Sequence, residues 1–192
     1  SGHMASVGYD MYVKLIDEAV REVSGAGLDQ RYETSVNLPV DAYLPEDFVR
    51  GSDVRMDIYK LIAQVGTSAQ RDDCVEELID RFGDLPAACE NLVYIAYIKN
   101  QSQRIGLDQV FLRRNQIVLR FSPHVQLDTQ RLVWALGQMN GRFSLAASAA
   151  PALLYPVSVS VDKTLRELAP NLERFCDMLL EQAPAGSQAG SD

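Results

Sequence analysis

The chain has 192 residues, 47% hydrophobic and 23% charged, which is typical of one globular domain able to fold without disulfides or metal ions. Its formal net charge is −8, and its strongest basic cluster is the pair Arg113-Arg114. Binding to nucleic acid needs clustered lysines and arginines, so this balance disfavours nucleic acid as the main partner and favours a basic protein surface.

Cys74, Cys89 and Cys176 are odd in number, widely spaced and free of any C-x-x-C motif. This predicts single buried thiols in a reducing compartment rather than a disulfide framework or a zinc site. No apolar run approaches the roughly 18 residues that span a bilayer. We therefore expect a cytoplasmic domain with no membrane segment and no cofactor.

The two ends of the chain read differently from its middle. Residues 1–6 begin with Ser-Gly-His-Met, which resembles the remnant of an expression tag. Residues 183–192 are rich in Ala, Gly and Ser and predict a disordered tail. Between them, apolar residues at helical spacing predict a helical linker over 7–30, and a folded domain is expected over 31–182.

The domain begins with a predicted strand over 31–40, where polar and apolar residues alternate. Pro39 either ends this strand or places it at a sheet edge. Apolar periodicity and capping residues then predict three helices, over 53–65, 69–82 and 86–105.

The remaining elements are shorter. Two strands over 107–112 and 116–121 are joined by three residues and predict a hairpin. They are followed by a predicted helix, two strands and a closing helix, over 128–139, 142–145, 157–161 and 162–181. This order predicts an α+β fold, in which a helix-rich domain carries a small mixed or antiparallel sheet.

The helix over 69–82 has the sharpest division of residue types. At 100° per residue, its apolar residues fall within an arc of roughly 140° and are expected to face the core. They are Cys74, Val75, Leu78, Ile79 and Phe82. The opposite arc is acidic, with a single arginine at its rim: Asp72, Asp73, Glu76, Glu77, Asp80 and Arg81.

This acidic face has three readings. It is a solvated surface, a protein-binding patch, or a divalent-cation site of a metal-dependent hydrolase built on Asp73, Glu77 and Asp80. Sites for Mg²⁺ or Ca²⁺ normally draw oxygens from more than one element, which disfavours the third reading. Glu77 and Arg81 are also spaced for a surface ion pair worth about 0.3–0.5 kcal/mol.

No catalytic motif is visible in the sequence. The only histidines are His3 and His124, and neither the phosphate-binding glycine motifs nor a nucleophile elbow occurs. A nucleophile–histidine site would have to depend on His124 alone. The sequence therefore predicts a non-catalytic domain that binds another protein.

Two segments in register resemble a known family. ELIDRFGDLP, residues 77–86, and LPEDFVRGSDVRMDIYKLIA, residues 44–63, closely resemble the C-terminal domain of the bacterial transcription-repair coupling factors. The second segment carries an R-x-x-x-Y-K helix, here Arg55, Tyr59 and Lys60. The similarity extends over about residues 7–112.

The resemblance implies a regulatory domain of an ATP-driven DNA translocase that displaces stalled RNA polymerase. In that family the domain contacts the UvrB-like module of the same polypeptide and covers its UvrA-binding surface. Glu77, Asp80 and Arg81 stand at the positions that the family uses for this contact. Helical geometry extends the surface to Asp73 and Glu76. We expect a monomer; the alternative is a nucleic-acid-binding module.

Overall fold

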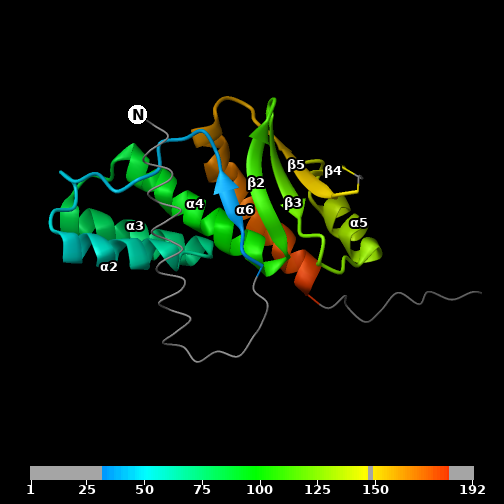
Figure 1. Cartoon of the computed structure of the whole chain (residues 1–192), viewed down its shortest axis with the longest axis horizontal. Helices are drawn as coiled ribbons and strands as arrows, with labels where there is room; N and C mark the ends of the chain where they lie inside the picture. The colour runs from blue at the N-terminus through cyan, green and yellow to red at the C-terminus, as the bar shows by residue number, and fades with distance from the viewer. Residues whose placement is uncertain (1–31, 147–148, 182–192) are drawn as a thin grey trace, which may run out of the picture.

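The computed structural model describes residues 32–146 and 149–181, whose helices and strands are shown in Figure 1. In chain order the elements are β1 (Ser35–Asn37), α2 (Ser52–Ala63), α3 (Ser68–Phe82), α4 (Ala87–Arg104), β2 (Leu107–Arg113), β3 (Gln116–Phe121), α5 (Thr129–Gln138), β4 (Ser144–Ala146), β5 (Ala152–Pro156) and α6 (Val161–Leu180). The predicted α+β fold is confirmed. The predicted linker over 7–30 and the predicted tail over 183–192 lie outside the described residues.

The strands form one mixed sheet in the order β1-β2-β3-β5-β4. β1 pairs with β2 in parallel, and the other neighbours are antiparallel. The alternation over 31–40 predicts a longer strand than the three paired residues of β1. Pro39 follows closely, and β1 lies at the sheet edge, so both outcomes expected of this proline are observed.

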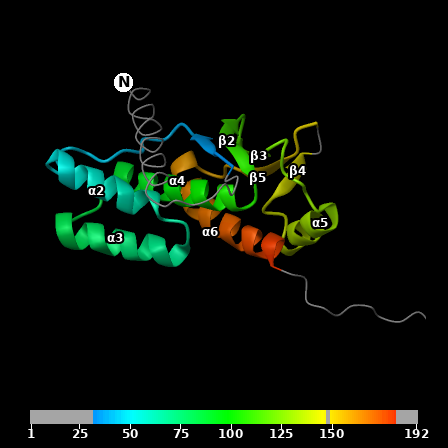
Figure 2. The same cartoon turned by 60° about the horizontal axis from the view of Figure 1, so that its bottom comes forward.

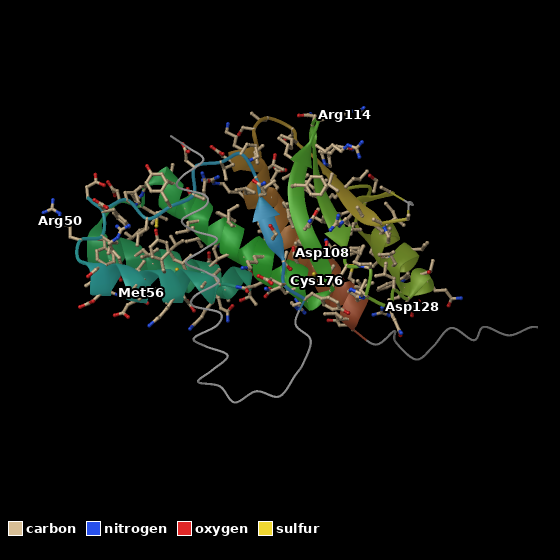
Figure 3. The ribbon with its side chains drawn as sticks, in the orientation of Figure 1. Arg50, Met56, Asp108, Arg114, Asp128 and Cys176 are labelled. Atoms are coloured by element: carbon tan, nitrogen blue, oxygen red, sulfur yellow. The ribbon has the colours of Figure 1, made fainter. Side chains whose placement is uncertain are left out.

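The predicted hairpin between β2 and β3 is confirmed. Arg113 pairs with Gln116, and the intervening Arg114 has a φ of 55°. A two-residue hairpin turn needs this left-handed backbone because its twist matches that of the strands it joins. The turn places Arg114 at the tip of the hairpin (Figure 3).

The strand predicted over 157–161 is wrong. β5 ends before this segment and pairs along β3, with Leu153 and Tyr155 buried in the core. Val159 is 73% exposed, and the Ser160 hydroxyl accepts a hydrogen bond from an N–H in the first turn of α6. Ser160 caps α6, which begins at Val161, and the place beside β3 is taken by β5 earlier in the chain. The strand predicted over 142–145 is observed as β4.

Helix α4 is the centre of the domain, and residues 91–98 within it are all buried. α2 and α3 pack on one side of α4, and α6 packs on the other (Figures 1 and 2). Asn100 on α4 donates hydrogen bonds to the carbonyls of Ala63 and Val65, at 2.9 and 2.8 Å. This amide satisfies carbonyls at the end of α2 and fixes the turn into α3.

The R-x-x-x-Y-K residues hold the turn that precedes α2. Arg55 donates to the carbonyls of Leu44 and Val49 at 2.8 and 3.1 Å. The Tyr59 hydroxyl accepts a hydrogen bond from the Leu44 N–H at 3.3 Å. Because a guanidinium that bonds two carbonyls orders the loop around it, two of the three motif residues have a structural role.

The sheet has two unlike faces. Figure 2 shows α4, α5 and α6 on one side of it. Ile117, Leu119 and Phe121 of β3 point to that side and are at most 1% exposed. No helix within residues 32–146 or 149–181 covers the opposite side.

Candidate partner-binding surface on helix α3

Helix α3 is capped at both ends. The Thr67 hydroxyl accepts a hydrogen bond from the Gln70 N–H at 3.2 Å. At the other end Gly83 has a φ of 90° and donates its N–H to the Ile79 carbonyl at 2.9 Å. Both ends are therefore satisfied locally, and the helix keeps its shape up to the surface residues of its last turn.

Two side chains anchor α3 to the body of the domain. Cys74 and Leu78, one turn apart, are 3% and 0% exposed. Phe82 is half-buried, and its ring lies 5.6 Å from the ring of Phe48. The helix packs mainly against α4. Its attachment is therefore a narrow stripe.

Ile79 departs from the prediction that it faces the core. Its side chain is 44% exposed, while Leu78 beside it is fully buried. A helix at the edge of a domain, packed mainly against one neighbour, buries a stripe narrower than the roughly 140° arc of its apolar residues. Ile79 stands at the outer margin of that arc and remains in solvent next to the acidic face.

The five residues predicted to bind a partner are brought together as expected. They are all exposed on the solvent side of α3: Asp73, Glu76, Glu77, Asp80 and Arg81. Arg81 donates to Glu77 at 3.0 Å, with the two side chains 44% and 46% exposed. The Arg81 guanidinium also lies 5.0 Å from the centre of the Phe82 ring. The predicted surface pair is thus confirmed.

The remaining carboxylates of this face differ in their partners. Asp72 pairs with Arg71 at 2.6 Å, and Arg71 also donates to the Tyr94 hydroxyl at 2.7 Å. Among the described residues, Asp73 and Asp80 make no ion pair. These carboxylates are free to accept charge-assisted hydrogen bonds from arginines of a partner.

The part of the chain that the structure describes contains no cluster suited to a metal ion. No group of three or more His, Cys, Asp or Glu side chains there could hold a metal ion. A hollow of about 870 Å³ beside β1 is lined by two charged residues among those described, Asp41 and Asp162. His124 is exposed, and its backbone N–H donates to the Ser122 hydroxyl at 3.3 Å.

The cysteines are buried single thiols, as predicted. Burial raises the pKa of Cys74 to about 11, and the charge of Glu77 adds to this rise. Burial likewise raises the pKa of Cys89 to about 12. A thiol whose pKa lies this far above neutrality keeps its proton and is a poor nucleophile.

Within residues 32–146 and 149–181, every helix is too short or too polar to span a lipid bilayer.

Comparisons with known proteins agree with this geometry. A family model described as the TRCF domain matches residues 38–132. The chain is 30% identical over 151 residues to the transcription-repair-coupling factor of Escherichia coli K12, covering 76% of this chain and 13% of that protein. The corresponding protein of Myxococcus xanthus is 26% identical over 183 residues, covering 95% of this chain and 15% of that protein.

A solved structure shows the same fold. It is the crystal structure of the C-terminal domain of a transcription-repair coupling factor, with a TM-score of 0.62 and 27% sequence identity. The match covers 78% of this chain and 94% of that domain.

The fold and the sequence matches together define a C-terminal module of the kind found in coupling factors of DNA repair. The chain belongs to the TRCF domain family. It spans between one tenth and one sixth of the length of the relatives named above.

Proposed function

We propose that this domain is a non-catalytic brake on a transcription-repair coupling factor. It docks the exposed face of α3 on a UvrB-like module of the same polypeptide and masks the surface of that module that binds UvrA. The observation that carries the proposal is the face itself. Glu77, Asp80 and Arg81 stand together in solvent on a helix that is capped at both ends.

The chemistry of this face suits a contact that must be released. Asp80 is free to accept from a partner's arginine, and Arg81 keeps donors beyond the one it gives to Glu77. Exposed charge pairs contribute modestly to affinity and are screened by salt. A shift of 1–3 kcal/mol between docked and released forms changes their ratio by roughly 5–150-fold.

The test measures binding of the 192-residue chain to an isolated UvrB-like module. The variant Glu77→Ala, Asp80→Ala, Arg81→Ala is expected to weaken binding by at least about fivefold, the low end of such couplings. Raising the ionic strength is expected to weaken wild-type binding. In a competition arm, the wild-type chain is expected to displace UvrA from the module, and the triple variant is not.

The matched control is Asp53→Ala, Asp57→Ala, Lys60→Ala on α2, which removes the same charges from another exposed helix face. It is expected to bind like wild type. Unchanged affinity in the α3 variant, or an equal loss in the α2 variant, would contradict the proposed surface. Binding that is intact but fails to displace UvrA would contradict the masking role alone.

A further inference from the structure

The uncovered face of the sheet carries a second surface, remote from α3. β2, β3 and β5 contribute to it the residues that alternate with their core-facing side chains. A hollow of about 360 Å³ opens on this face. This volume lies within the usual range of ligand pockets.

The floor of this hollow is apolar. Phe111, Val118, Ala152 and Leu154 line it, one or two from each of the three strands. Val118 lies opposite both Phe111 on β2 and Leu154 on β5, so the three side chains form a row across the sheet. Phe111 and Leu154 are half-buried, which leaves apolar area available for contact.

Arginines surround the floor. Arg113, Arg114 and Arg120 line the hollow, and no acidic side chain among the described residues does. Arg120 is engaged by Asp108, donating to its two carboxylate oxygens at 3.1 and 3.3 Å. Arg113 and Arg114 are exposed and make no ion pair or side-chain hydrogen bond with any described residue. Two unneutralised cations thus flank an apolar floor in a chain of net charge −8.

We propose that this surface, defined by Phe111, Arg113, Arg114, Val118 and Leu154, binds an acidic segment of a partner protein whose apolar side chains enter the hollow. The two free guanidinium groups complement carboxylates on the partner. The row of apolar side chains supplies the non-polar contact that an interface core needs.

An acidic peptide fits this surface better than a nucleic acid. A polyanion would meet two free arginines here, while the chain as a whole, at net −8, repels it. Of the described residues that line the hollow, Phe111 alone is aromatic, whereas single-stranded nucleic acid is typically held by several stacking platforms. A short peptide needs only the local charge and the apolar floor.

The experiment titrates the full chain into a short fluorescein-labelled peptide in which Asp and Glu alternate with Leu and Phe, at low salt. Saturable binding is expected, and Arg113→Glu, Arg114→Glu is expected to weaken it by about tenfold or more. Phe111→Ser is expected to weaken binding without changing the charge. The same peptide with Lys at every acidic position is expected not to bind.

The matched control is Arg50→Glu, Arg174→Glu, which makes the same change in net charge at exposed arginines elsewhere. Figure 3 shows Arg50 at the left end of the domain, away from Arg114 at the tip of the hairpin. This control and the α3 triple variant are both expected to bind the peptide like wild type.

Absence of saturable peptide binding, or an equal loss in both double variants, would overturn the proposal. A labelled oligothymidylate run in parallel tests the other class of partner. If it binds more tightly than the peptide and loses affinity in Arg113→Glu, Arg114→Glu, the surface belongs to nucleic acid and the proposal is wrong. None of these outcomes depends on the UvrB-like module, so the experiment tests this surface independently of the function proposed for α3.

Discussion

The exposed face of α3 and the open face of the sheet differ in the sign of their charge and in their apolar content. On α3, acidic groups dominate and the one cation, Arg81, is bound to its own neighbour Glu77. On the sheet, apolar side chains form the floor, and Arg113 and Arg114 have no partner among the described residues. Within the described residues, both surfaces carry unpaired charge, but of opposite sign: the carboxylates of Asp73 and Asp80 on α3, and the guanidinium groups of Arg113 and Arg114 on the sheet.

The two surfaces also differ in how they are held. α3 is attached by the narrow stripe of Cys74 and Leu78, whereas the sheet strands are fixed by backbone hydrogen bonds to neighbours on both sides. A surface on a lightly held helix is more easily loosened than one on a central strand. The three predictions below test this difference.

The largest expected effect comes from truncating an anchor of α3. Leu78→Ala removes a fully buried side chain and is expected to lower the free energy of unfolding by about 2–5 kcal/mol. Val118→Ala, on the sheet face that α4, α5 and α6 do not cover, is expected to cost less, about 1–2 kcal/mol, because Val118 is 8% exposed and the change removes only two buried carbon atoms. Urea unfolding of both variants measures the difference. Equal losses would show that α3 is no more dependent on its stripe than the sheet is on this face.

A second prediction concerns local opening. Cys74 lies on the buried side of α3, and Cys176 lies on α6 against the Gln101 carbonyl, to which its thiol donates at 3.3 Å. Burial raises both thiol pKa values, so neither reacts while buried. If α3 opens alone, a thiol reagent at pH 8 is expected to modify Cys74 at least about tenfold faster than Cys176. Peptide mapping by mass spectrometry gives the two rates; identical rates would mean that only global unfolding exposes them.

The smallest effects are expected from the ion pairs of the two surfaces. Asp108 and Arg120 are 21% and 35% exposed and bonded through two contacts, so a double-mutant cycle is expected to give about 1 kcal/mol. Glu77 and Arg81 are more exposed and are expected to give about 0.3–0.5 kcal/mol. A coupling for Glu77–Arg81 as large as that of the sheet pair would contradict the picture of a loosely paired, releasable face.

The helices were predictable from sequence because each carries several turns of apolar periodicity between recognisable caps. The range predicted for α3, residues 69–82, agrees closely with the observed helix, which Thr67 and Gly83 cap. The acidic face was predictable for the same reason, since helical geometry alone puts Asp73, Glu77 and Asp80 on one side. The exposure of Ile79 was not predictable. Periodicity gives the direction in which a side chain points, but not how much of the helix surface a neighbouring helix covers.

The sheet was harder to predict because its pairing is not local. The valines of 157–161 have high β propensity, yet β5 forms earlier, where Leu153 and Tyr155 meet the core side of β3. Misplacing β5 also hides the open face, since Leu154 joins Phe111 and Val118 only in the observed register. In the sequence, Arg113-Arg114 is a basic pair too small to bind phosphates; in the fold it is the rim of a hollow.

β1 gives the domain a mechanical property. Its three residues pair in parallel with β2, and the Thr34 hydroxyl beside it donates to the Leu107 carbonyl at 2.6 Å. Tension applied at Tyr32 would therefore first load a few hydrogen bonds at a sheet edge. Those bonds are expected to break before the buried contacts of α4 are loaded. Such a force would detach one edge strand and leave both proposed binding surfaces intact.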